Sequence, residues 1–237
     1  MYVDNSDIYA EKLFVSAHSD GGGARIYYSN VSFSDFTFTN NSDITAGGLY
    51  LFHCDISLMN GEITNNSATS NSGGMKVVDC TGTITSIEVS NNSASGNYGG
   101  GIYLRRSAVN MSDLIVENNF SETKGGGIYI KDDRSDGLIP SLVNSKIINN
   151  SSNYGGGIFI ADISNNPAIG GNIFFENYAD YGGAISIDNS NLNLNDNGFY
   201  NNNALQGSAI HLYQSSTAEM SLLTILKNID AIESAIY

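Results

Sequence analysis

The chain has little positive charge and no long hydrophobic run. Its 237 residues include ten Lys and Arg against 24 Asp and Glu, which gives a formal net charge of −14. Binding to the phosphates of nucleic acids, or to acidic membrane surfaces, requires a basic face, so this composition excludes both kinds of partner. No apolar run reaches the length of a membrane span, and we therefore expect no direct insertion of this segment into a membrane.

The N-terminus also lacks the pattern of a secretory signal. It reads MYVDNSDIYAEK, without the basic and apolar regions that such a signal contains. If the protein is exported, its signal lies outside this segment. Three isolated histidines give no Ser/His/Asp arrangement, so the sequence predicts no catalytic residue of that kind.

What the chain has instead is a repeat rich in asparagine and glycine. It contains 31 Asn and 26 Gly, and regularly spaced apolar residues that can form a continuous buried surface. One landmark is an aliphatic residue two places before another apolar residue, and it recurs every 23 to 30 residues. Its nine copies are Ile26, Leu49, Met75, Ile102, Ile128, Ile158, Ile185, Ile210 and Ile236. A second landmark, apolar-x-x-Asn, stands eight to ten residues earlier, with His18 at this position in the first copy.

Alternation inside each repeat predicts three short strands. After the glycines, Ile102 and Leu104 alternate with outward residues, and similar runs follow at Val109 to Met111 and at Leu114 to Val116. No repeat contains ten helix-favouring residues between glycine clusters, which excludes helical repeats. The predicted fold is all-β, a single-stranded right-handed parallel β-helix of about nine coils of about 26 residues. Residues 1–237 then form one domain.

The glycines and asparagines have structural roles in such a fold. Glycine accepts positive φ and lets stacked backbones approach closely where each coil turns into a strand. Asparagine tolerates left-handed geometry, and its amide can bond the equivalent amide of the next coil. We therefore expect an internal ladder formed by Asn41, Asn66, Asn92, Asn119, Asn150, Asn177, Asn202 and Asn228.

Cys54 and Cys80 occupy equivalent positions in adjacent coils, five residues after Leu49 and Met75. One coil spacing is a Cα distance that a disulfide accepts. Alternation directs both side chains inward, so they form either a disulfide, as in extracellular proteins, or two buried thiols. His53 and Asp79 point the other way, and the sequence predicts no metal site and no cofactor.

A stripe of aromatic residues is predicted on the outside of the solenoid. The residue between two inward aliphatic residues points outward, and it is Tyr or Phe in six of nine coils. Together with one histidine, the stripe consists of Tyr27, Tyr50, Tyr103, Tyr129, Phe159, His211 and Tyr237. Exposed rings could bind a glycan or a protein of a host or cell surface. Ring stacking between neighbouring strands is the alternative role.

The paired motifs resemble the repeats of chlamydial polymorphic outer membrane proteins. They include GGAI at 182–185, the GGGI copies, FTNN at 38–41, FFEN at 174–177 and FYNN at 199–202. Similar repeats occur in adhesin-like surface proteins. The resemblance implies a surface adhesin or cell-envelope protein, extracellular or at the cell surface. Eight Asn-x-Ser/Thr sequons, among them Asn40, Asn65, Asn91 and Asn149, also make the chain a candidate glycoprotein.

Three functions are compatible with these observations. The leading hypothesis is a non-enzymatic structural stalk or adhesin-like binding region. The alternative is a β-helix that binds or cleaves polysaccharides as a lyase or hydrolase, although the acidic residues do not gather in one outward column. The third is a filament subunit that stacks end to end, because neither end shows a capping segment; the other explanation for open ends is that the chain is part of a longer one.

Overall fold

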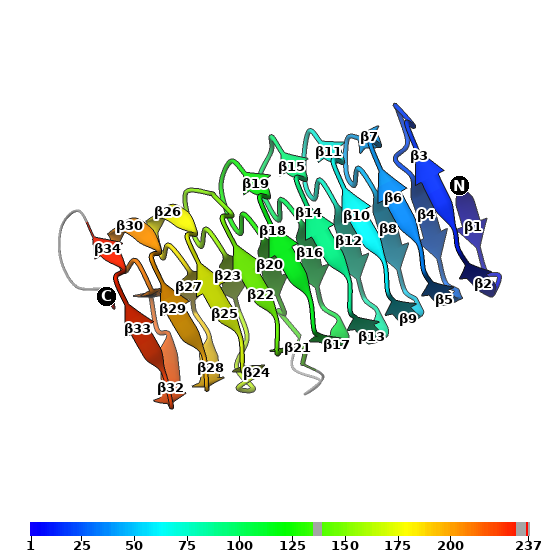
Figure 1. The fold of residues 1–237 in the computed structure, drawn as a ribbon. Coiled ribbons are helices and arrows are strands. Elements are labelled where there is room, and N and C mark those ends of the chain that lie inside the picture. Colours follow the sequence, from blue (N-terminus) through cyan, green and yellow to red (C-terminus); the bar gives the residue numbers. More distant parts are fainter. Residues whose placement is uncertain (135–138, 231–235, 237) are drawn as a thin grey trace.

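Short runs in which buried and exposed side chains alternate build the strands of the structure. In Asn30–Ser34, for example, Val31 and Phe33 are buried while their neighbours face outward, which is the period of a half-buried strand. The computed structural model describes residues 1–134, 139–230 and 236, and these contain strands and no helix. The strands wind into an elongated solenoid whose two termini lie at opposite ends (Figure 1).

Each coil contributes one strand to each of three parallel nine-stranded sheets, which we name A, B and C in the order in which the chain visits them. Sheet A contains β1 (Tyr2–Asp4), β4 (Ala24–Tyr27), β8 (Leu49–Phe52), β12 (Met75–Val78), β16 (Ile102–Arg105), β20 (Ile128–Lys131), β23 (Ile158–Ala161), β27 (Ile185–Asp188) and β31 (Ile210–Tyr213). Sheet B contains β2 (Ile8–Glu11), β5 (Asn30–Ser34), β9 (Asp55–Met59), β13 (Thr81–Thr85), β17 (Ala108–Ser112), β21 (Ser141–Val143), β24 (Ala168–Gly170), β28 (Asn191–Asn195) and β32 (Thr217–Ser221).

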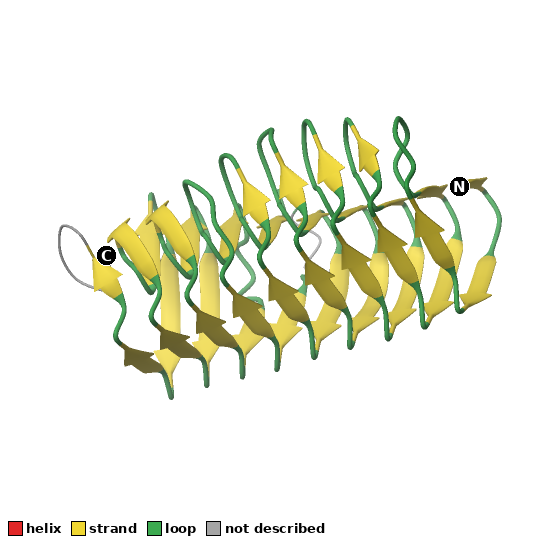
Figure 2. Cartoon of the chain, turned by 45° about the horizontal axis from the view of Figure 1, so that its top comes forward, coloured by secondary structure: helices red, strands yellow, loops and turns green. Residues whose placement is uncertain are grey.

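Sheet C contains β3 (Phe14–Ser16), β6 (Thr37–Thr39), β10 (Glu62–Thr64), β14 (Glu88–Ser90), β18 (Ile115–Glu117), β22 (Lys146–Ile148), β25 (Ile173–Phe175), β29 (Gly198–Tyr200) and β33 (Thr224–Leu226). Before the chain returns to sheet A it passes through a loop region that carries short strands (Figure 2). These are β7 (Ser42–Asp43), β11 (Ser67–Ala68), β15 (Ser93–Ala94), β19 (Phe120–Ser121), β26 (Tyr178–Tyr181), β30 (Asn203–Gln206) and β34 (Ile229–Asp230).

The inward side chains of the three sheets fill the lumen as one continuous core. It extends from Val15 to Ile210 and is mainly aliphatic, with three Phe rings in tilted and edge-to-face contact in the second coil and a Phe174–Phe199 stack near the other end. The predicted all-β fold of nine coils is therefore confirmed.

The asparagine ladder is present and lies inside the solenoid, where the chain leaves sheet C. Each Oδ1 accepts one hydrogen bond from the backbone N–H and one from the Nδ2 of the asparagine one coil earlier, at 2.9 to 3.1 Å. Each Nδ2 also donates to a backbone carbonyl, as Asn119 does to Val89 at 2.8 Å. The links run from Asn41 to Asn228 through all eight predicted residues. The backbone N–H of His18 donates to Asn41 Oδ1 at 3.2 Å and so adds the expected ninth position.

The residue directly before each ladder asparagine has positive φ. In most coils it is another asparagine, with φ between 49° and 56°, a conformation that asparagine tolerates better than most residues. The Asn-Asn doublets are thus explained, because the first residue turns the chain and the second bonds the neighbouring coil. Glycine is required a few residues later, where a Cβ on Gly126 would meet the backbone oxygens of Ser151 and Gly156.

The structure corrects the register of the first full repeat. Leu49 pairs with Ala24, while Ile26 pairs with Leu51. Tyr27 consequently lies beside Phe52, and Arg25 occupies the place beside Tyr50 that the sequence pattern assigned to Tyr27. A shift of two residues leaves the inward and outward faces of a strand unchanged, so alternation alone could not detect the error.

A second, shorter ladder at the turn from sheet B to sheet C was not predicted. The N–H of Ser145 donates to Asn172 Oδ1 at 2.9 Å, and the N–H and Nδ2 of Asn172 donate to Asn197 Oδ1 at 3.0 and 3.1 Å. These residues stand five positions before the ladder asparagines of their coils. Earlier coils have apolar residues or glycine at this position, and that mixture hid the signal.

Replacing Asn119 with alanine is expected to destabilise the fold by about 2–4 kcal/mol, because buried groups of Asn92 and Val89 lose their partners. The matched control is Asn110→Ala, on the exposed face of sheet B, with an expected change within about 0.5 kcal/mol. Urea unfolding of both variants measures the difference. Equal losses would contradict the role given to the ladder.

Candidate functional site

The outer face of sheet A carries the predicted aromatic residues at one outward position of successive coils. Strand pairing aligns Arg25, Tyr50, Lys76, Tyr103, Tyr129, Phe159, Ser186 and His211, which we call the aromatic column. Tyr27 belongs to the neighbouring column, and Tyr237 lies outside the described residues.

The prediction that this column is exposed is wrong for most of its members. Tyr103, Tyr129 and Phe159 retain 7%, 5% and 1% of their accessible surface, and His211 retains 4%. The rings stack along the sheet, with centroids 5.1 Å apart for Tyr103 and Tyr129 and 5.6 Å apart for Tyr129 and Phe159. They form a second hydrophobic cluster outside the lumen, which supports the stacking role.

Side chains from the loop before sheet A cover these rings. Tyr98, Lys124, Tyr154, Tyr181 and Gln206 occupy equivalent positions in five successive coils, and we call them the covering column. Tyr98 lies 4.7 Å from the Tyr129 ring between centroids, and Tyr154 lies 6.5 Å from Phe159. Each covering residue directly precedes a glycine in the sequence. This position before a glycine can be recognised in the sequence. The direction of its side chain cannot be predicted, because strand alternation does not apply to a turn.

A groove of about 530 Å³ opens in this layer around Ser186. Ser186 is fully buried at the place in the column where neighbouring coils have Phe159 and His211. Its small side chain leaves the space that an aromatic ring fills elsewhere. The groove is lined by Lys124, Tyr154, Phe159, Tyr181, Ser186, Asp188, Gln206, His211, Leu212, Tyr213 and Gln214.

One wall of the groove combines rings with an ion pair. Lys124 Nζ lies 4.4 Å from the centroid of the Phe159 ring and 3.9 Å from Asp188 Oδ2. Burial raises the pKa of the Asp188 carboxyl, and the charge of Lys124 opposes that effect. Asp188 Oδ1 has no hydrogen-bond partner within the described residues. Asp188 thus brings a carboxylate to the lining of the groove, with its Oδ1 covered by the surrounding atoms.

The histidine in the groove does not form an activated nucleophile with Ser186. The Ser186 Oγ to His211 Nδ1 distance is 3.4 Å, which is long for a hydrogen bond between these groups, and the serine is fully buried. Burial lowers the pKa of His211, while the charge of Asp188 raises it. The imidazole is thus mainly neutral at neutral pH and acts as a polar group of the floor.

Comparison with known proteins identifies the fold family. The family described as the right-handed β-helix region matches residues 1–139 and again residues 83–233, almost the whole chain between them. The chain belongs to the right-handed β-helix family. The predicted handedness is thereby confirmed. No curated protein and no solved structure matches the chain. Among the described residues, no helix is long and apolar enough to cross a membrane.

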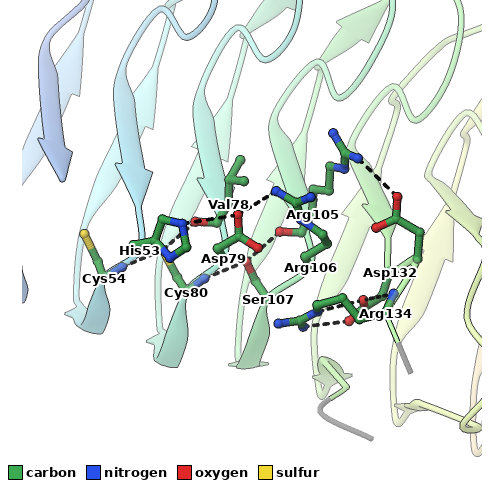
Figure 3. Close-up of polar contacts among 11 residues, drawn as sticks. His53, Cys54, Val78, Asp79, Cys80, Arg105, Arg106, Ser107, Asp132 and Arg134 are labelled. Atoms are coloured by element: carbon green, nitrogen blue, oxygen red, sulfur yellow. Dashed lines mark hydrogen bonds and ion pairs between the residues drawn. The ribbon is translucent and has the colours of Figure 1, made fainter. Parts of the chain in front are cut away.

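In this right-handed β-helix the two cysteines belong to a third ladder, at the turn from sheet A to sheet B. The Cys54 N–H donates to Cys80 Sγ at 3.3 Å, and the Cys80 N–H donates to Ser107 Oγ at 3.1 Å (Figure 3). Serines make the same kind of bond in other coils, where Ser6 donates to Ser29 and Ile163 donates to Ser190.

Both cysteines are buried free thiols, so the structure has the thiol alternative and not the disulfide. A hydrogen bond from Cys80 lowers the pKa of the Cys54 thiol. The same bond, together with burial, raises the pKa of Cys80. The pair thus has the ladder role of the serines around it.

The residues directly before this ladder form a polar row on the outside of the β-helix. His53 Nε2 lies 3.8 Å from Asp79 Oδ2, and Arg106 donates to the same oxygen at 2.7 Å (Figure 3). The Tyr28 ring stacks on His53, with centroids 5.1 Å apart. No three His, Cys, Asp or Glu side chains of the described residues converge as metal ligands.

Denatured without reductant, the protein is expected to react with two equivalents of a thiol reagent, because the structure contains both cysteines as thiols. In the Cys54→Ser variant the expected value is one equivalent, and the fold is retained because serine already occupies this ladder position in other coils. Colorimetric thiol titration with intact-mass measurement gives both numbers. No reactive thiol in the unmodified chain would establish the disulfide instead.

Proposed function

We propose that the chain is a non-enzymatic β-helix of an extracellular or cell-surface protein and that its groove binds a glycan. The observation that carries the proposal is the lining of the groove around Ser186. Tyr154 and Tyr181 stack on one another with centroids 4.9 Å apart, and both rings line the groove together with Asp188. Aromatic rings fit the C–H faces of sugars, while carboxylate and amide groups bond their hydroxyls.

The repeat motifs support a place at a surface. Their resemblance to chlamydial polymorphic outer membrane protein repeats favours an adhesin-like region, and the stiff solenoid suits a stalk that holds a groove away from its attachment point. The partner would be a glycan carried by a host or by a cell-surface protein.

Glycosylation of the chain itself is compatible with some of its sequons. Asn40, Asn65, Asn91 and Asn149 are exposed, at equivalent turn positions before the ladder. Asn119 and Asn150 belong to the buried ladder, so their sequons are not accessible in the folded protein. Attached glycans would line one edge, at the turn that leaves sheet C.

The double variant Tyr154→Ser, Tyr181→Ser is expected to weaken glycan binding by about tenfold, since one stacked ring contributes about 0.5–1.5 kcal/mol. Both rings are only partly buried, so the fold should persist. A glycan array followed by calorimetry on the best ligand measures the effect. Tyr178→Ser, exposed and outside the groove, is the matched control. Equal binding by all three proteins would contradict the proposal.

Polysaccharide cleavage is the second candidate, and Asp188 is the observation that favours it. A carboxyl group whose pKa burial raises is suited to proton transfer. Hydrolysis of a glycosidic bond usually needs two carboxyl groups, whereas Asp188 is the only carboxyl group among the described residues that line the groove. A reaction with a single base, such as elimination, fits the lining better than hydrolysis.

Incubation with a panel of polysaccharides, including uronic-acid polymers, is expected to release no products. The described lining of the groove has no second carboxyl group for hydrolysis, and its one candidate base for elimination, Asp188, is paired with Lys124. Reducing-end assays detect hydrolysis, and ultraviolet absorbance detects unsaturated products. Product release by the unmodified chain, and its loss in Asp188→Asn, would establish the enzyme in place of the binding protein.

A further inference from the structure

The outer face of sheet A concentrates the few cations of this acidic chain. Four of the ten Lys and Arg lie at outward positions of β4, β12, β16 and β20, namely Arg25, Lys76, Arg105 and Lys131. Lys124 of the covering column lies above the same face. Half of the positively charged residues of a chain with a net charge of −14 are therefore on the face that carries the groove.

All of these cations except Lys76 pair with a carboxylate. The pairs are Arg25 with Asp43, Arg105 with Asp133 at 3.1 Å, Lys131 with Asp162 at 2.7 Å, and Lys124 with Asp188 at 3.9 Å. In the described part of the chain, no carboxylate lies within ion-pair distance of Lys76. Its charge is the one on this face that a ligand could neutralise.

Two tyrosine rings hold the Lys76 ammonium in place. Nζ lies 5.1 Å from the centroid of Tyr50 and 5.2 Å from that of Tyr103, so the side chain is fixed between strands β8 and β16. Burial, together with the charges of Arg105 and Arg25, lowers the pKa of Lys76 to about 8. The protein thus keeps this ammonium partly desolvated and without a counter-ion.

We propose that Lys76, between Tyr50 and Tyr103, is a binding site for an anionic group, a carboxylate or a sulfate, of a ligand that lies along sheet A. An anion would supply the missing partner beside the partly exposed ring of Tyr50. The inference rests on the proposed glycan binding in one respect, since it takes the anionic group to belong to the same glycan.

The distance between the two sites suits one extended ligand. Strand β12, which carries Lys76, is three strands from β23 at the edge of the groove. At about 4.8 Å per strand this separation is about 14 Å. Tyr103 and Tyr129 stack between the two sites and are buried under Tyr98, so a ligand that spans the sites would lie on the partly exposed ring of Tyr98.

Binding of an anion at Lys76 should depend on pH in a defined direction. An anion stabilises the ammonium form, so binding raises the pKa of Lys76 and takes up a proton where the free amine is present. Affinity is constant well below pH 8 and falls as the pH rises through about 8. The other charged groups near Lys76 are Arg25, Arg105 and Asp43, which is paired with Arg25, and the two guanidinium groups keep their charge in this window. Burial raises the pKa of Tyr50 and Tyr103, and both stay neutral there.

The direct test follows the ¹³Cε signal of Lys76 by NMR between pH 6 and 11, assigned from its absence in Lys76→Met. The probes are sodium glucuronate, glucose 6-sulfate and glucose. The expected result is a rise of the Lys76 midpoint by about one pH unit, a tenfold change in proton affinity, with either anion and no change with glucose. A response to only one of the two anions identifies the group that the site takes. A midpoint that neither anion moves overturns the proposal.

Binding measurements separate this inference from the proposed function. For the glycan selected on the array and its carboxylated or sulfated form, Lys76→Met is expected to lose about tenfold affinity for the acidic form only. Lys12→Met, an exposed lysine elsewhere, is the control. If the Tyr154 and Tyr181 variant loses glycan binding but Lys76→Met binds the acidic and neutral forms like the unmodified chain, the anion site at Lys76 is wrong and glycan binding in the groove is supported. If anions raise the titration midpoint of Lys76 while the Tyr154 and Tyr181 variant binds the glycan normally, the anion site is supported and glycan binding in the groove is wrong.

Discussion

The hydrogen bonds of the asparagine ladder are the interaction on which the rest of the structure depends. Each ladder amide bonds both the backbone and the side chain of its neighbour, so it fixes the position of two coils relative to one another. A buried amide left without a partner costs about 1–3 kcal/mol, and slippage of one coil would leave several such groups unpaired. The shorter ladders at the other two turns act in the same way, with Asn172 and with Ser107 as acceptors.

The fixed register of the coils also determines how the outward side chains of neighbouring coils pack against one another. Equivalent outward residues are held one strand spacing apart, which is a suitable distance for ring stacking. The aromatic column therefore packs against itself, and the covering column closes over it. In a column of stacked rings, one small residue leaves a gap as large as a missing ring. Ser186 interrupts the stack, and the groove lies at that interruption.

The same register constrains charge. Like charges in neighbouring coils would repel at one strand spacing, and the cations of sheet A are instead separated by rings or paired with carboxylates of adjacent turns. Lys76 departs from this arrangement because its neighbours along the column are two tyrosines. The departure is of interest for function because an unpaired, partly desolvated cation is costly to keep unless something binds it.

The sequence by itself determined the fold, the nine coils and all eight ladder asparagines. It could do so because a solenoid repeats local rules, so that alternation and the spacing of asparagine and glycine place the strands of the three sheets, apart from the two-residue register error at Ile26. It did not determine whether the aromatic column is exposed, because Tyr98, Tyr154 and Tyr181 reach it from the irregular region before sheet A, where no period describes the direction of the side chains. The pairing of Lys124 with Asp188, 64 residues apart in the chain, likewise exists only after the coils stack. Contacts between different columns depend on the three-dimensional path of the turns, and that path was decided by the tertiary structure alone.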